Sequence, residues 1–173
     1  INKYKECQKH NIRLLTLWED WFKTKPEVLE SIIKTKLGII ENKIGARNCI
    51  IKEVDSSNCR GFLNQNHIQG FSPSSIKLGL YYENELVSVM TFSKTRIGIG
   101  KKEEGYELVR FCNKLNTIVN GGASKLLKYF IEHYKPTQII SYSSNDISNG
   151  DLYNILGFQK ENESAIAYWY INH

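Results

Sequence analysis

The stretch "NTIVNGGASKLLKYF" (residues 116–130) places two glycines directly ahead of a segment with helical apolar periodicity. The apolar residues that lie on one helical stripe are Leu126, Leu127, Phe130, Ile131 and Tyr134. Because glycine lacks a Cβ atom, Gly121 and Gly122 allow a ligand to approach the backbone closely. The first N–H groups of a helix also carry partial positive charge. The stretch therefore predicts either a phosphate-binding helix start or a plain turn with packing glycines.

The composition favours one core and a mildly basic surface. The chain has 173 residues, of which 41% are hydrophobic, and a formal net charge of +5. This length supports one good core, and the charge is compatible with a polyanionic partner such as nucleic acid. No apolar run reaches the roughly 18 residues of a membrane span, and the start has no signal-peptide core. We expect a protein without membrane contact, in the cytoplasm.

The cysteines do not predict a metal site. Cys7, Cys49, Cys59 and Cys112 form no CxxC pair. Cys7 and His10 have a ligand-like spacing, but no second pair lies nearby in the sequence. We expect a reducing compartment, free thiols and no metal.

A helix with marked ends is predicted over residues 24–37. Thr24 is the expected N-cap, Glu27 its capping-box partner, and Pro26 lies in the first turn. Gly38 is expected to end the helix.

The chain is predicted to have an N-terminal piece and a larger domain. A short apolar strand over 12–18 and the helix that follows it form the piece 1–40. The polar segment 41–48 is the expected linker, and 49–173 the main domain.

The main domain is predicted to have an α+β fold. The order of elements predicts a mixed, mostly antiparallel sheet flanked by helices, with the N-terminal strand–helix piece beside it. We expect a helix over 56–67 capped by Ser56 or Ser57, and a charged loop over 96–105. The predicted strands are 49–54, the hairpin 75–94, 106–113, 137–144 and 165–171, and the further helices are the one after Gly122 and 149–158.

Two motifs give this order a resemblance to the GNAT acyltransferase superfamily. "VNGGASKLL" (119–127) resembles the loop-to-helix motif of that family, and "DLYNILGF" (151–158) resembles its late helix. The resemblance implies a GNAT-like fold over 49–173 and binding of acetyl-CoA or another acyl-CoA. It also implies that backbone amides of the loop hold the pyrophosphate. The residues concerned are Asn120, Gly121, Gly122, Ala123, Ser124 and Lys125.

Four segments are similar in order to the Mom-like branch, phage proteins that modify DNA bases. They are "NHIQG" (66–70), "YELVRF" (106–111), "GGASKLL" (121–127) and "SYSSNDISNGDLY" (141–153). This resemblance implies catalytic roles for His67, Tyr153 and Asp146, and transfer of an acyl group to a nucleobase amine. Ile68 stands where the branch has a tyrosine, and Asp146 lies two residues beyond the position of its aspartate, Ser144.

The N-terminal piece resembles the closing part of Vsr-like endonucleases, which occur in phage homing enzymes. The segments that carry the resemblance are "KECQKHNIRLLTLWEDWF" (5–22) and "VLESIIKTKLG" (28–38). It implies that a nuclease domain precedes them in a longer chain. The alternative function is then a catalytically inactive, GNAT-shaped DNA-binding module of a homing endonuclease; a metabolic or protein acetyltransferase is a third hypothesis.

Each candidate residue also has a structural interpretation. His67 could be a hydrogen-bonded histidine at a helix end, and Tyr153 a core tyrosine. Arg110 could pair with Glu107 or contact a phosphate. A charged loop is usually a solvated surface, but here it could contact a nucleic-acid backbone. The residues that we expect at a DNA interface are Lys94, Arg96, Lys101, Lys102 and Arg110.

Overall fold

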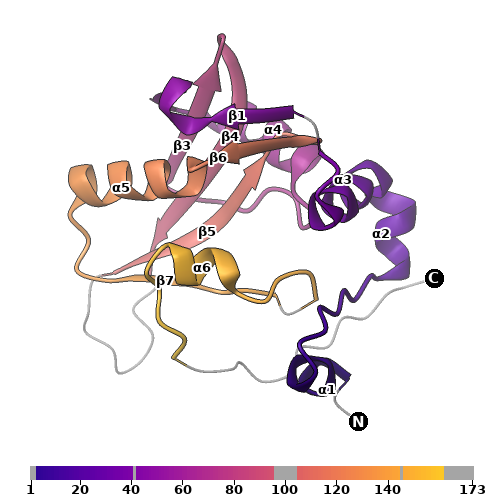
Figure 1. Ribbon diagram of the computed structural model, residues 1–173. Coiled ribbons are helices and arrows are strands. Elements are labelled where there is room, and N and C mark those ends of the chain that lie inside the picture. Colours follow the sequence, from indigo (N-terminus) through magenta and orange to yellow (C-terminus); the bar gives the residue numbers. More distant parts are fainter. Residues whose placement is uncertain (1–2, 41, 96–104, 145, 162–173) are drawn as a thin grey trace.

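The centre of the fold is a five-stranded sheet of order β2-β3-β4-β5-β7 (Figure 1). The computed structural model describes residues 3–40, 42–95, 105–144 and 146–161. Neighbouring strands are antiparallel except β5 and β7, which run parallel. The expected mixed, mostly antiparallel α+β sheet is therefore confirmed. The strands are β2 (Ile50–Glu53), β3 (Ile76–Tyr82), β4 (Glu85–Lys94), β5 (Tyr106–Asn113) and β7 (Ile139–Ser141).

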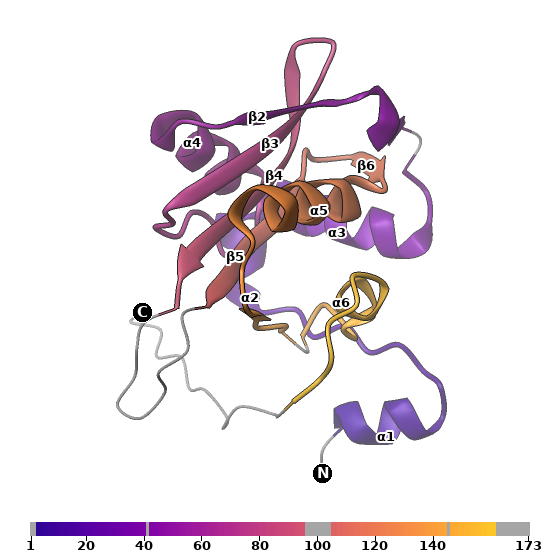
Figure 2. The same ribbon diagram turned by 90° about the vertical axis from the view of Figure 1, so that its left-hand side faces the viewer.

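Two helices cover opposite faces of this sheet, α5 (Gly122–Tyr134) and α4 (Ser56–Asn66) (Figure 2). The alternation of side chains along β4 explains this arrangement. Met90 and Phe92 pack in the cluster that includes α5, whereas Val89 packs with Cys59 and Leu63 of α4. Both faces of the central strand are thus covered.

The α5 face is held by a stack of aromatic rings. Phe130 and Phe92 are both fully buried, and their ring centroids lie 3.6 Å apart with an angle of 7° between the planes. Tyr106 meets Phe130 edge to face at 5.2 Å. This contact fixes the position of α5 along β4 and β5.

Residues 42–48, expected to be a linker, belong to the folded structure. They form β1 (Asn42–Gly45) and the short 3-10 helix η1 (Ala46–Asn48). β1 pairs in parallel with β6 (Thr117–Asn120), a strand that the sequence analysis did not predict. Ile44 and Ala46 are buried. The segment did not look like a strand because most of its residues are polar. In a strand, however, only alternate side chains point inward, so a mostly polar segment can still pair.

The N-terminal piece contains α1 (Lys3–Lys9), α2 (Glu19–Thr24) and α3 (Pro26–Leu37). The predicted strand over 12–18 is wrong: this segment forms no strand with any described part of the chain, although the Thr16 amide donates to the Asp146 carbonyl at 2.8 Å. Helix α1 stands apart from the sheet in both views (Figures 1 and 2).

Two predicted helix caps are wrong. Thr24 ends α2, where its hydroxyl donates to the Asp20 carbonyl, and Lys25 precedes α3 without a side-chain cap. The Asp55 carboxylate, rather than Ser56 or Ser57, caps α4 by accepting from the amides of Ser57 and Asn58. Gly38 does end α3 in the left-handed conformation, at φ 73°.

The C-terminal elements are shorter than predicted. The late helix α6 covers Asp151–Ile155 rather than 149–158. The final strand predicted over 165–171 lies outside the described residues, as do residues 96–104 of the charged loop. None of the described helices combines the length and apolar character needed to cross a membrane. The cysteines are free, and burial raises the pKa values of the Cys49, Cys59 and Cys112 thiols.

Replacing Phe130 with alanine should lower the free energy of unfolding by about 3–5 kcal/mol, because it removes a fully buried ring and leaves a cavity against Phe92. Urea denaturation measures the change. The control is Ile131→Ala on the next residue, which is 45% exposed and should cost about 0.5 kcal/mol or less. Equal losses for the two variants would show that α5 does not pack as described.

Candidate functional site

The start of α5 presents unpaired backbone amides. Gly121 adopts the left-handed conformation at φ 76°, and the first hydrogen bond of this helix end runs from the Lys125 amide to the Gly121 carbonyl. The amides of Gly122, Ala123 and Ser124 therefore have no acceptor within the helix, as at any helix N-terminus. Such amides can bind an anion where solvent reaches them.

The two glycines have different roles. A Cβ atom on Gly122 would lie 3.0 Å from Cγ1 of Val119 and 3.3 Å from Cδ1 of Leu80, so this glycine allows α5 to pack closely on β6 and β3. Gly121 is exposed, and its positive φ is the conformation that glycine adopts without strain. The packing interpretation thus applies to Gly122, whereas Gly121 lies at the surface.

Only part of the expected cofactor set faces solvent. Asn120, Gly121 and Ser124 are exposed, whereas Gly122 and Ala123 are buried. The Lys125 ammonium donates to the carbonyls of Ala46 and Cys49 at 2.9 and 2.6 Å. It thereby holds the chain between β1 and β2 against the start of α5.

A cleft of about 310 Å³ lies between α5 and α6. Ser124 belongs to its lining, so the cleft reaches the first turn of α5. Ile131 and Ile155 are 45% and 76% exposed on its walls. The sequence placed Ile131 on the buried stripe of the helix, and only the structure shows that it faces this cleft. The lining residues are Ser124, Leu127, Lys128, Ile131, Glu132, Ile155 and Leu156.

Tyr153 on α6 lies at the end of β7. Its hydroxyl accepts a hydrogen bond from Oγ of Ser141 at 3.2 Å and donates to the Tyr142 carbonyl at 3.4 Å. Its ring packs edge to face against Phe158. The side chain is half-buried, with a hydroxyl that can give up a proton.

His67 caps the C-terminal end of α4 and is neutral near pH 7. Its Nδ1 atom accepts from the Gln69 amide at 3.1 Å, so the neutral ring carries its proton on Nε2. Burial, together with the positive charges of Arg110 and Lys25, lowers the pKa of His67 to about 4. A group with this pKa is a weak base at pH 7 and serves better as a hydrogen-bond donor.

Arg110 on β5 lies within electrostatic range of both His67 and Tyr153. Its Nε atom donates to the Gly70 carbonyl at 3.3 Å and its Nη1 atom to the Val109 carbonyl at 3.0 Å. Burial lowers its pKa, and the negative charge of Glu107 opposes that change. No ion pair joins Arg110 to Glu107 in the described part of the chain.

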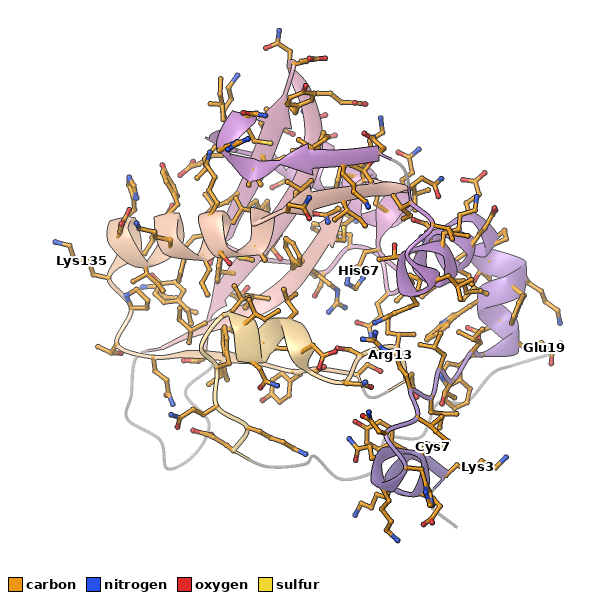
Figure 3. All side chains as sticks on the ribbon, viewed as in Figure 1. Lys3, Cys7, Arg13, Glu19, His67 and Lys135 are labelled. Atoms are coloured by element: carbon orange, nitrogen blue, oxygen red, sulfur yellow. The ribbon has the colours of Figure 1, made fainter. Side chains whose placement is uncertain are left out.

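The third expected catalytic residue, Asp146, binds the N-terminal segment. Its carboxylate accepts from Nε1 of Trp18 at 3.3 Å and from Oγ of Ser144 at 3.0 Å. Close by in the sequence, Asp151 at the start of α6 forms an ion pair with Arg13 at 3.0 Å, and Figure 3 shows Arg13 next to α6. Asp146 therefore has structural partners in this arrangement.

The expected DNA-binding residues are only partly described. Lys94 is exposed at the end of β4. Arg96, Lys101 and Lys102 lie outside the described residues. Among the described residues, no group of His, Cys, Asp and Glu side chains is placed to hold a metal ion.

The stability of the protein should fall as the pH decreases from about 6.5 to about 4. The pKa of His67 is about 4 in the folded state against an ordinary value of 6.5, so in this interval the unfolded state binds a proton that the folded state does not. The loss amounts to about 3 kcal/mol. Urea denaturation at a series of pH values measures it.

His67→Asn should flatten this pH dependence, because the amide oxygen can still accept from Gln69 but does not titrate. The control is His133→Asn on the exposed side of α5, which should retain the slope. A slope unchanged in His67→Asn would assign the acid sensitivity to another group.

Solved acetyltransferases share this architecture at low sequence identity. No family model matches the sequence, and no curated protein matches it. A ribosomal-protein-alanine N-acetyltransferase from Brucella melitensis is 11% identical with a TM-score of 0.52; the match covers 70% of this chain and 99% of that one. An aminoglycoside 6'-N-acetyltransferase from Acinetobacter haemolyticus is 13% identical with a TM-score of 0.50, covering 71% and 99%. An integron cassette protein from V. cholerae is 12% identical with a TM-score of 0.50, covering 72% and 94%. The chain therefore has the fold of the GNAT acetyltransferases.

Proposed function

We propose that this chain is an acyl-CoA-dependent acyltransferase that acts on an amine. The observation that carries the proposal is the exposed start of α5, which opens onto the α5–α6 cleft within a GNAT fold. Unpaired amides beside an apolar cleft suit a ligand with an anionic and an apolar part. Acyl-CoA combines a pyrophosphate with a long, largely apolar arm.

The residues at the helix start fit such a cofactor. A Cβ atom on Gly121 would meet only Ala46, at 3.8 Å, so the backbone here is open to a ligand. The amides from Gly122 to Ser124 would hold the pyrophosphate, and the walls of Leu127 and Ile155 would hold the arm. The bound cofactor supplies the activated acyl group.

Two side chains outside the lining of the α5–α6 cleft have chemistry that suits the transfer. The Tyr153 hydroxyl can donate a proton to the leaving thiolate when the amine displaces it. His67, neutral and protonated on Nε2, can donate a hydrogen bond to the acceptor. Arg110 lies within electrostatic range of both and can stabilise negative charge.

Ser124→Glu tests the cofactor site. Ser124 is exposed in the first turn of α5, where an acidic side chain stabilises a helix but repels a pyrophosphate. The variant should keep its stability and bind acetyl-CoA about tenfold or more weakly, as measured by calorimetry. The matched control is Ser57→Glu in the first turn of α4, which should bind like the parent. Equal binding by the parent and Ser124→Glu would place the cofactor elsewhere.

We further propose a nucleobase amine in DNA as the acceptor. The resemblance to the Mom-like proteins, the net charge of +5 and the basic stretch that begins at Lys94 support it. The alternative is an inactive DNA-binding module, which the engagement of Asp146 by Trp18 and Ser144 favours. Calorimetry with acetyl-CoA, with and without duplex DNA, separates them: an active transferase binds both ligands, whereas the module binds DNA alone.

Lys101→Ala/Lys102→Ala should weaken the binding of duplex DNA at low salt. Each lost phosphate contact should make the slope of log K against log salt shallower by about 0.9, because fewer counterions are released on binding. The control is Lys23→Ala, which removes an exposed charge from α2. An unchanged slope would exclude Lys101 and Lys102 from the interface, and the absence of binding at low salt would refute the DNA proposal.

A further inference from the structure

Two cationic side chains from distant parts of the chain meet the end of α4. Lys25, between α2 and α3, donates through Nζ to the Asn64 carbonyl. Arg110, on β5, donates through Nε to the Gly70 carbonyl. His67 lies between these two acceptors in the sequence, and the charges of both cations act on it.

Neither cation has a carboxylate partner among the described residues. The ion pairs of the described residues include neither Lys25 nor Arg110. Glu107 acts on Arg110 electrostatically without bonding to it. Asp151 is paired with Arg13. A half-buried guanidinium without a counterion loses hydration and gains no ion pair in return.

Hydrogen-bond donors remain at each of the three groups. A guanidinium has more N–H donors than the two that Gly70 and Val109 accept, and an ammonium has more than the one that Asn64 accepts. His67 keeps its Nε2 proton, because Nδ1 is the acceptor for Gln69. These donors have no acceptor among the described residues.

We propose that Lys25, His67 and Arg110 form a binding site for a phosphate group of the acceptor. The site lies at the end of α4, and none of its three residues lines the α5–α6 cleft, so it differs from the cofactor site. The proposal deepens the proposed function and rests on it, because it names the acceptor as a phosphate-bearing amine. It also makes the α2–α3 piece part of the site.

The donor set favours a phosphate. Arg110 offers a planar fork, Lys25 a point charge, and His67 a neutral N–H from a third direction. In this proposal, the groups from β5, from the start of α3 and from the end of α4 would each donate to a different oxygen of a tetrahedral anion. A phosphodiester of DNA and the phosphate of a free nucleotide share this chemistry.

His67 is a built-in reporter for the test. Its pKa is held near 4 by burial and by the positive charges of Arg110 and Lys25. A bound phosphate offsets those charges and should raise the pKa of His67 by about one pH unit or more. NMR of the histidine ring protons between pH 4 and 8, with and without inorganic phosphate at constant ionic strength, measures the change.

The variants separate binding from general screening. Arg110→Gln should abolish the response to phosphate, and Arg110→Lys should restore part of it. Lys25→Gln, at a half-buried position, provides a second variant if Arg110→Gln does not fold. The control is Arg47→Gln at the exposed turn η1, which should respond like the parent. A response that survives both Arg110→Gln and Lys25→Gln would overturn the proposal.

A second arm of the titration replaces inorganic phosphate with a short DNA duplex. The probe that shifts the His67 resonance at the lower phosphate concentration identifies the source of the phosphate, and no shift with either probe overturns the proposal. Because acyl-CoA is absent, a failure here leaves acetyl-CoA binding and its Ser124→Glu test intact. Conversely, if the protein does not bind acetyl-CoA but His67 still responds to phosphate, the proposed transferase function is refuted and the phosphate site is not.

Discussion

The packing of α5 on the sheet is the contact on which the rest of the structure depends. Phe130 stacks on Phe92 in the middle of this interface, and Gly122 allows the first turn to lie directly on Val119 and Leu80. These two contacts hold α5 against the sheet, and together they set the position of its first turn. The exposure of Gly121 and Ser124 and the cleft toward α6 follow from that position.

The N-terminal piece is joined to the main domain through polar contacts. Arg13 pairs with Asp151, and Trp18 bonds to Asp146. Exposed pairs of this kind contribute little stability each, but they connect the segment before α2 with the start of α6. Because α6 also carries Tyr153, these contacts connect the N-terminal piece to the helix that holds this candidate catalytic residue.

Charge is distributed unequally on the two faces of the sheet. On the α5 side, Lys125 is bound to backbone carbonyls and the cleft walls are largely apolar. At the end of α4, Arg110 and Lys25 lie near a neutral His67 without carboxylate partners in the described residues. The first environment suits a ligand with a long apolar arm, and the second suits a compact anion.

The sequence by itself determined the hairpin of β3 and β4, strand β5, helix α5 and the fold class, because period-2 and period-3.6 patterns are local. It identified the glycines before α5 but could not assign packing to Gly122 and exposure to Gly121, which depends on where Val119 and Leu80 lie. It predicted a linker over 41–48, because the pairing of this short polar segment with residues about 75 positions away cannot be recognised from its local pattern.

The low pKa of His67 and the partners of Asp146 were likewise decided only by the tertiary structure. Both depend on burial and on the approach of Lys25, Arg110 and Trp18, which are long-range consequences of the fold.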